Sequence, residues 1–254
     1  MKVLSVQLDS IWQDAEGNLL KLRKHFQSYE MGQYDVVVLP ELFYCGFSMQ
    51  VDQVSQTRQG AVYKTLSELA QQYGVYIIAG FAERVSSTQA RNCALVFDRN
   101  GNEQACYVKN RAFQFAGEGK HYQAGNESVL FEVDGVVCSV FICYDLRFPE
   151  LFRQVVPQAE MVFVIANWPE SRQSHWEVLL QARAIENQCF VVGVNRIGQD
   201  GNGLMYVGGS MVIDPLGEIL SYADSEQACQ ITEVPIKQVK LVRLQYPFLE
   251  DIKS

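Results

Sequence analysis

Short apolar runs rich in β-branched residues recur along this chain, and they limit its possible folds more than any other feature. Four of them cover residues 36–39, 75–81, 136–142 and 161–166, and proline or polar residues soon follow each one. A strand that carries apolar side chains on both faces is typical of a sheet covered on both sides, as parallel sheets in α/β proteins are. The runs therefore predict an α/β protein.

Helical patterns separate these runs. Apolar spacings of three and four residues predict helices over residues 14–29, 57–73 and 172–187. Phe148-Pro149-Glu150 is typical of a further helix start, because proline is tolerated in a first helical turn. Strands at 92–97 and 104–109 flank an Asn-Gly turn, residues 208–220 form a hairpin around Pro215, and residues 228–234 form a last strand before a short helix.

The pattern contains about eleven strands and four or five helices. No linker, repeat or change of composition divides them, so we interpret residues 1–254 as one α/β domain. This number of strands is too large for a single small open sheet. Two sheets packed together with helices outside them fit better.

Composition excludes several classes of protein. The hydrophobic fraction of 48% suits a globular enzyme, and a net charge of -8 without a basic run argues against nucleic-acid binding. No segment approaches the ~18 apolar residues of a membrane helix, and the N-terminus lacks the pattern of a signal peptide. Seven cysteines without a CxxC pair indicate reduced thiols in the cytoplasm. No metal site is expected, since the three histidines share no ligand spacing with each other or with a cysteine pair.

Two irregular stretches need an interpretation. Residues 110–126 form the longest segment without periodicity, and such segments inside compact domains are usually functional loops. Residues 198–203 are rich in glycine, but they lack the strand-to-helix context of a phosphate-binding loop. We therefore predict a turn at 198–203.

Three chemically complementary residues each follow a predicted strand. Glu41 comes after residues 36–39, Lys109 closes 104–109, and Cys143 follows 136–142. A thiolate attacks a carbonyl carbon, and a carboxylate takes the proton of the thiol and returns it to the leaving amine. A cation stabilises the oxyanion and lowers the thiol pKa. Each residue alone is weak evidence. Cys143 and Glu41 also have ordinary explanations, since free cysteines are commonly buried hydrophobes and single glutamates commonly lie in solvated loops.

Motifs spread along the chain resemble the carbon–nitrogen hydrolases of the nitrilase superfamily. They lie around Glu41, Lys109 and Cys143, in the order of that family, and supporting motifs follow them. The segments are Leu39-Pro40-Glu41, Tyr107-Val108-Lys109, Cys143-Tyr144-Asp145-Leu146-Arg147-Phe148-Pro149-Glu150, Ala166-Asn167-Trp168-Pro169, Ala182-Arg183-Ala184-Ile185-Glu186-Asn187 and Gly208-Gly209-Ser210.

The resemblance implies roles for these residues. Glu41 would be the general base, Lys109 the oxyanion donor and Cys143 the nucleophile, and Glu118 would orient Lys109 or the attacking water. The backbone N–H of Tyr144 would complete the oxyanion hole. The family fold is an α-β-β-α sandwich that pairs into a homodimer, and no cofactor is implied. One departure is Arg111-Ala112, which stand where the family commonly has His-Leu.

Within the superfamily, the segment around Glu118 and His121 is most similar to the ω-amidase branch. The implied activity is hydrolysis of the terminal amide of 2-oxoglutaramate or 2-oxosuccinamate through a cysteine thioester. Arg147 and Arg111 are candidates for binding the substrate carboxylate. The candidate pocket walls are aromatic: Phe43, Phe115, Trp168 and Tyr144.

Three alternatives stay open at this point. N-carbamoyl amino acid hydrolysis and nitrile hydrolysis can use the same triad. A Cys–His hydrolase would need His25, His121 or His175 as its base. A binding module on the same fold would need none of the triad.

Overall fold

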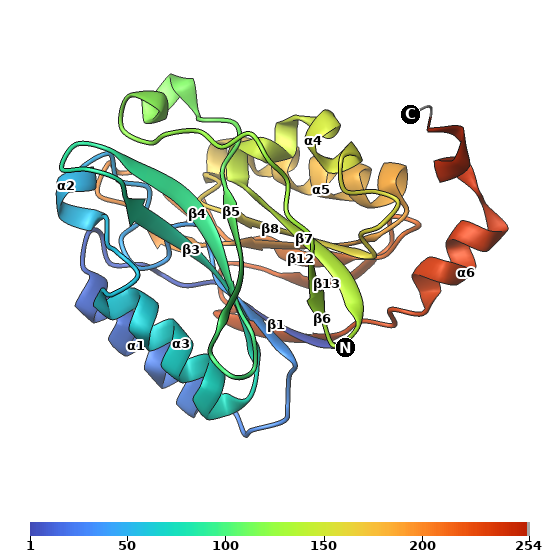
Figure 1. Cartoon of the computed structure of the whole chain (residues 1–254), viewed down its shortest axis with the longest axis horizontal. Coiled ribbons are helices and arrows are strands. Elements are labelled where there is room, and N and C mark those ends of the chain that lie inside the picture. Colours follow the sequence, from blue (N-terminus) through green and yellow to red (C-terminus); the bar gives the residue numbers. More distant parts are fainter. Residues whose placement is uncertain (253–254) are drawn as a thin grey trace.

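The computed structural model of this protein describes residues 1–252 and contains two six-stranded sheets that lie face to face (Figure 1). The strands of the first sheet, in spatial order, are β14 (Cys229–Glu233), β1 (Lys2–Val6), β2 (Val36–Val38), β3 (Tyr76–Arg84), β4 (Ala90–Phe97) and β5 (Glu103–Val108). The strands of the second are β13 (Ile219–Ala223), β12 (Ser210–Ile213), β9 (Phe190–Asn195), β8 (Met161–Ala166), β7 (Val136–Ile142) and β6 (Phe131–Val133). A separate hairpin joins β10 (Ile197–Gln199) to β11 (Met205–Val207).

Each sheet has a parallel centre with antiparallel edges. Strands β1, β2 and β3 run parallel in the first sheet, and β7, β8 and β9 run parallel in the second. The apolar runs of the sequence form these central strands, because a strand between the other sheet and a helix layer has both faces buried.

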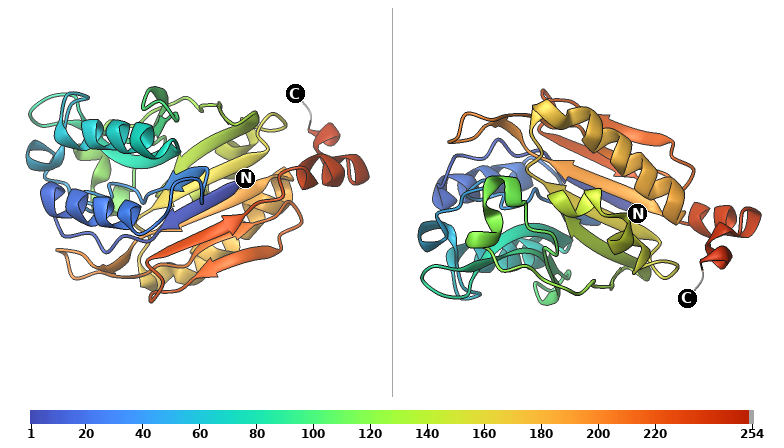
Figure 2. Two further views of the ribbon diagram at one scale, coloured as in Figure 1. Left: turned by 90° about the horizontal axis from the view of Figure 1, so that it is seen from below. Right: turned by 90° about the horizontal axis from the view of Figure 1, so that it is seen from above.

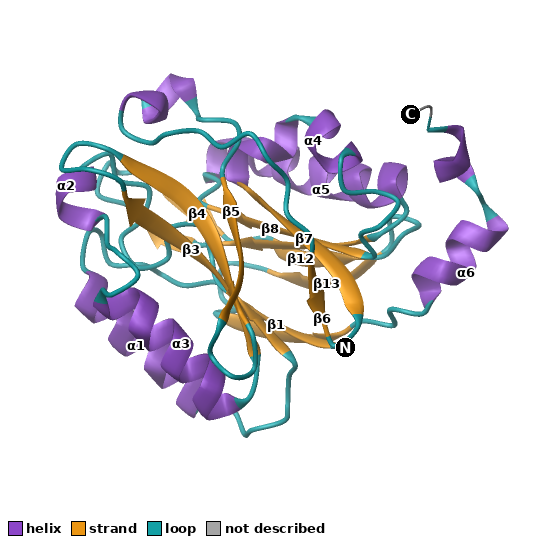
Figure 3. Ribbon diagram, in the orientation of Figure 1, coloured by secondary structure: helices purple, strands orange, loops and turns teal. Residues whose placement is uncertain are grey.

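Helices cover the two outer faces (Figure 3). The helices on the first sheet are α1 (Ala15–Gln27) and α3 (Ala61–Tyr73), with the short α2 (Val51–Val54) at its end. Those on the second sheet are α4 (Pro149–Arg153) and α5 (Gln173–Asn187). Helix α6 (Gln238–Gln245) follows β14 and extends beyond the edge of the sandwich (Figure 2). The predicted α-β-β-α sandwich is therefore confirmed.

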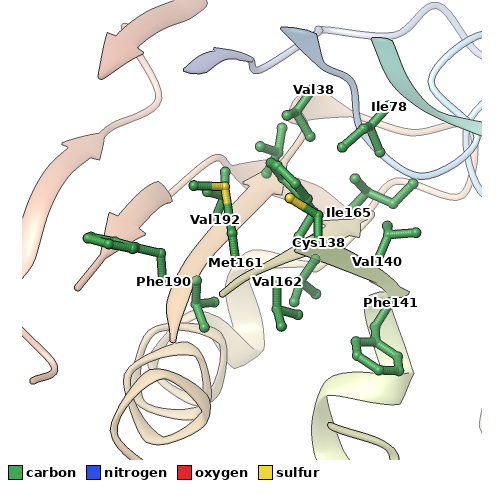
Figure 4. Close-up of a cluster of buried hydrophobic side chains, with 14 of the residues drawn as sticks. Val38, Ile78, Cys138, Val140, Phe141, Met161, Val162, Ile165, Phe190 and Val192 are labelled. Atoms are coloured by element: carbon green, nitrogen blue, oxygen red, sulfur yellow. The ribbon is translucent and has the colours of Figure 1, made fainter. Parts of the chain in front are cut away.

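Apolar side chains from both sheets fill the space between them. Val38 and Ile78 of the first sheet face Cys138, Val140 and Ile165 of the second (Figure 4), and all five are fully buried. Full burial of a side chain of this size contributes about 1.5–3 kcal/mol. The core thus fixes how the two sheets sit against each other, and with them the strand ends that carry the site.

Most of the predicted elements are present, and the strands at 136–142 and 161–166 have the predicted bounds. The second predicted helix begins later than expected, at Ala61, because the side chain of Gln56 accepts from the Val62 N–H and holds the preceding turn. Strands β6, β10 and β11 and helix α2 were not predicted. Each has only three or four residues, too few to show a period.

Candidate active site

Glu41 and Lys109 form a buried ion pair between the ends of β2 and β5. Lys109 Nζ lies 2.8 Å from Glu41 Oε1, and both side chains are almost completely buried, at 0% exposed for Glu41 and 2% for Lys109. Glu41 stands in a tight turn next to Leu42, whose φ of 45° is in the left-handed region. Gly80 of β3 makes room for this turn, since a Cβ there would lie 2.6 Å from the Cα of Glu41.

Glu118 is a second carboxylate on the same lysine. Lys109 Nζ donates to Glu118 Oε1 and Oε2, each at 3.0 Å, and the Phe113 N–H donates to Oε2 at 2.6 Å. Burial by itself lowers the pKa of Lys109, but the charges of Glu118 and Glu41 outweigh it and raise that pKa above its ordinary value. Lys109 is therefore a permanent cation held between two carboxylates.

Cys143 begins a short turn of 3-10 helix directly after β7. Its φ of 47° is in the left-handed region, which costs about 1–3 kcal/mol in a non-glycine residue. The side-chain carboxyl group of Asp145 stabilises the turn by accepting from the Ile142 N–H at 3.1 Å. It also accepts from the Arg111 N–H at 2.8 Å and from the Tyr107 hydroxyl at 2.9 Å, which ties the Cys143 turn to the Lys109 segment.

The thiol of Cys143 lies beside the charged cluster. Burial and the charge of Glu41 raise the pKa of Cys143 well above its ordinary value, and the opposing effect of Lys109 does not cancel them. The resting residue is therefore a thiol at neutral pH. Such a thiol needs a base to become a nucleophile.

Asn167 joins Glu41 to the Cys143 thiol across the two sheets. Its backbone N–H donates to Glu41 Oε2 at 2.9 Å, and its side chain donates to the Glu41 carbonyl at 2.7 Å. The carbonyl of Asn167 accepts from Cys143 Sγ at 3.8 Å. The ends of β2, β7 and β8 are thus held together by hydrogen bonds.

A cavity of about 340 Å³ opens onto Lys109 and Cys143. Its lining includes five aromatic rings, which belong to Phe47, Phe113, Tyr144, Trp168 and Tyr206. Asp200 and Asn202, from the loop between β10 and β11, also line it. The turn predicted at 198–203 is confirmed for residues 200–203, whereas Gly198 and Gln199 belong to β10, and this turn also borders the cavity.

Two arginines line the same cavity, and aromatic rings hold both. The guanidinium of Arg147 lies 4.7 Å from the ring centre of Trp168, and that of Arg172 lies 5.6 Å from the ring centre of Phe113. Arg147 also lies 3.2 Å from His175 Nδ1. Within residues 1–252, neither arginine forms an ion pair with a carboxylate. Their charges are free to bind an anion.

The structure brings seven of the ten predicted site residues together. Glu41, Lys109, Glu118 and Cys143 form the cluster described above. Tyr144, Arg147 and Trp168 line the cavity.

The other three predicted residues lie outside the cavity lining. Phe43 is fully buried in the outer core and packs edge-on against Tyr44, because the turn after β2 directs it away from the second sheet. Phe115 is 90% exposed on the loop, while Phe113 faces the cavity instead. Arg111 pairs with Glu150 at 3.4 Å and lies over Phe148, so its charge is already neutralised.

Sequence reasoning assigned no role to four residues that shape the site: Asn92, Asp145, Asn167 and Arg172. Asn92 had a usable signal, since it is a polar residue at the start of the otherwise apolar run 92–97. Arg172 had none, because an arginine next to a helix start is ordinary.

In the described part of the chain, no group of three His, Cys, Asp or Glu side chains is placed to hold a metal ion. No helix within residues 1–252 is long and apolar enough to cross a bilayer.

Comparison with known proteins gives consistent matches over the full length. A family model described as carbon-nitrogen hydrolase matches residues 2–244. Omega-amidase YafV of Escherichia coli (strain K12) is 37% identical over 254 residues, which cover 99% of this chain and 96% of that protein. The 2-oxoglutaramate amidase of Bacillus subtilis (strain 168) is 34% identical over 237 residues, covering 92% and 91%.

A solved structure agrees closely with this fold. XC1258 from Xanthomonas campestris, described as a CN-hydrolase superfamily protein with an arsenic adduct in the active site, matches with a TM-score of 0.94. The identity is 32%, and the match covers 100% of this chain and 97% of that one.

Proposed function

We propose that this chain, which belongs to the carbon–nitrogen hydrolase family, hydrolyses the terminal amide of 2-oxo dicarboxylate monoamides. Its motifs predicted that family. The products would be the dicarboxylate and ammonia, and the expected substrates are 2-oxoglutaramate and 2-oxosuccinamate. Relatives named omega-amidase and 2-oxoglutaramate amidase support this choice. The observation that carries the chemistry is the thiol of Cys143 beside a lysine held between two carboxylates at the wall of one cavity.

Acylation begins with proton transfer. Glu41 takes the proton of the Cys143 thiol, and the sulfur attacks the amide carbon. Lys109 Nζ and the Tyr144 N–H stabilise the oxyanion of the tetrahedral intermediate. When the C–N bond breaks, Glu41 returns the proton to the leaving nitrogen, so ammonia departs and a thioester remains.

Hydrolysis of the thioester reverses these roles. Glu41 takes a proton from water, the oxygen attacks the thioester carbon, and the sulfur leaves and regains the proton. Glu118 is less suited to this step, because each of its oxygens already accepts two hydrogen bonds, whereas Oε2 of Glu41 accepts one. Its role in the proposal is to position Lys109.

The two cavity arginines suit the other end of the substrate. A 2-oxo acid presents a carboxylate and an adjacent keto oxygen, and the planar guanidinium groups of Arg147 and Arg172 offer paired donors for them. An amino acid such as L-glutamine would place an ammonium beside two cations. The arginine pair therefore favours 2-oxo acids over amino acids.

A substrate panel tests the function. Initial rates of ammonia release are compared for 2-oxoglutaramate, 2-oxosuccinamate, L-glutamine, butanamide, an N-carbamoyl amino acid and a simple nitrile. The expected result is the highest kcat/KM for the two 2-oxo amides and no turnover by C143A. A higher kcat/KM for the carbamoyl compound or the nitrile would show that the proposed substrate class is wrong. Activity that survives in C143A would show that the proposed mechanism is wrong.

Arginine variants test the recognition of the carboxylate. R147Q and R172Q are expected to lower kcat/KM for 2-oxoglutaramate by about 10- to 100-fold, since each removes a charge facing the substrate anion. Butanamide hydrolysis should change little, because that substrate carries no carboxylate. R111Q is the matched control, since Arg111 is paired with Glu150 outside the cavity lining.

We also propose a homodimer in the cytoplasm. Large exposed apolar side chains on the outer side of α5 and on α6, namely Val178, Ile185, Leu241 and Leu244, support the dimer. All seven cysteines are free, which suits a reducing compartment. Light scattering coupled to gel filtration tests the dimer, and a monomeric mass would reject it.

A further inference from the structure

Asn92 contacts all three charged residues of the site. It lies on β4, between β3 and β5, and is 1% exposed. Its side-chain Nδ2 donates to Glu41 Oε1 at 2.7 Å and to Glu118 Oε1 at 3.0 Å. Its backbone carbonyl accepts from the Lys109 N–H at 2.9 Å. One neutral side chain thus bridges both carboxylates and borders the lysine.

The charges of the cluster explain why a neutral donor is needed there. Glu41 and Glu118 carry two negative charges, and Lys109 supplies one positive charge, so a buried excess of one negative charge remains. A hydrogen-bond donor to both carboxylates stabilises that excess without adding an ion. The amide must point its NH2 group at them, because ionised carboxylates only accept. Within residues 1–252 its Oδ1 has no hydrogen-bond partner, so the NH2 group alone fixes the side chain.

The orientation of Glu41 follows from these contacts. Its Oε1 is occupied by Lys109 and Asn92, whereas Oε2 accepts the N–H of Asn167. Asn167 is also the residue whose carbonyl contacts the Cys143 sulfur. Oε2 is therefore the oxygen placed to receive the thiol proton.

We propose that Asn92 is a positioning residue for the reaction: by bridging Glu41 and Glu118 it holds Glu41 Oε2 toward Cys143 and keeps Lys109 aligned as the oxyanion donor. This inference rests on the proposed roles of those residues. Asn92 does not line the cavity, so it touches neither substrate nor sulfur. Its effect belongs to the chemical step and not to substrate binding.

The first test compares kcat with KM. N92A is expected to lower kcat for 2-oxoglutaramate by about 10- to 100-fold, as for the loss of a hydrogen bond to a charged group, with KM nearly unchanged. N18A is the matched control. Asn18 is fully buried, and its side chain makes three hydrogen bonds to the backbone of Ile11 and Tyr44, outside the cavity lining. N18A should lower the melting temperature and leave kcat of the folded enzyme as in the wild type.

The second test uses pH. N92D has the shape of the wild-type side chain, but its ionised carboxylate cannot donate and adds a third negative charge next to Glu41, Glu118 and Lys109. At low pH the introduced carboxyl is neutral and regains an O–H donor. The ratio of kcat/KM for N92D to that for N92A should therefore rise as pH falls. N92A carries no ionisable group at this position, so the rise reports on the introduced carboxyl. A purely structural role would leave the ratio flat.

The outcomes separate the inference from the function. If wild type hydrolyses 2-oxoglutaramate while N92A keeps a kcat within about threefold of it, or the ratio stays flat, the positioning role is wrong and the function stands. If wild type hydrolyses none of the amides, the function fails and the positioning role fails with it. N92S, whose hydroxyl is too short to bridge both carboxylates, replaces N92A in both tests if N92A does not fold.

Discussion

Replacing Lys109 with methionine tests whether this lysine balances the charge of the buried cluster. Methionine keeps much of the length of the side chain but removes its charge. Lys109 Nζ lies 2.8 Å from Glu41 and 3.0 Å from Glu118, with 2% of the side chain exposed. Removing one partner of a buried ion pair costs about 3–5 kcal/mol, because it leaves an uncompensated charge. For a chain of this size the melting temperature should fall by roughly 6–20 °C.

Urea unfolding of K109M and two further variants gives the measurement. K240M is the surface control, since Lys240 is 78% exposed and lies 3.9 Å from Glu160, and its loss should cost under about 1 kcal/mol. The double variant K109M/E118Q should regain part of the lost stability, because only one buried carboxylate then lacks a counter-ion. Lower pH should narrow the gap between K109M and wild type, since a protonated carboxyl needs no cation.

Two results would refute the reasoning. One is a K109M variant no less stable than K240M. The other is a double variant less stable than K109M, which would mean that Glu118 stabilises the fold without its lysine.

Three further predictions concern the base, the nucleophile and its turn. E41Q should lower kcat for 2-oxoglutaramate far more than it changes KM, because a base acts in the transition state; a large KM effect with normal kcat would contradict its role as base. Intact-mass measurement during turnover should show an acyl adduct, and peptide mapping should place it on Cys143; an adduct on another cysteine would reject the assignment. Iodoacetamide labelling of the Cys143 thiol should still be rising above pH 9, since its pKa is well above the ordinary value. Burial raises the pKa of Asp145 to about 7, so the folded state holds a proton that the unfolded chain releases near pH 4. Stability should therefore fall between about pH 4 and 7 by up to ~1.4 kcal/mol per pH unit, and unfolding curves of D145N should lack this part of the decline.

The central strands and the cluster of Glu41, Lys109 and Cys143 were largely predictable from the sequence for the same physical reason. Buried parallel strands need continuous apolar runs, and polar residues directly after such runs lie at the sheet edge where sites form. Glu41 and Cys143 each follow such a run, and Lys109 follows the antiparallel edge strand β5, so the position of each residue at a strand end already indicated a shared location.

The direction of individual side chains was not predictable. Phe43 follows Glu41 closely, yet the left-handed backbone of Leu42 sends it into the outer core. Arg111 was a reasonable candidate for the substrate carboxylate, but Glu150 lies close enough to pair with it. Arg172 faces the cavity because the ring of Phe113, from a loop far away in the sequence, lies under it. Such outcomes depend on tertiary neighbours, which no local pattern contains.

The site draws on both sheets, and this has a practical consequence. Glu41, Asn92 and Lys109 come from the first sheet, whereas Cys143 and Asn167 follow strands of the second. Neither half of the chain alone holds a complete set of reacting groups. Two separately expressed fragments, cut in the exposed segment near residue 126, would each be inactive and would regain amide hydrolysis only on reassembly. Turnover would therefore report directly on the joining of the two halves, which includes the pairing of β14 with β1.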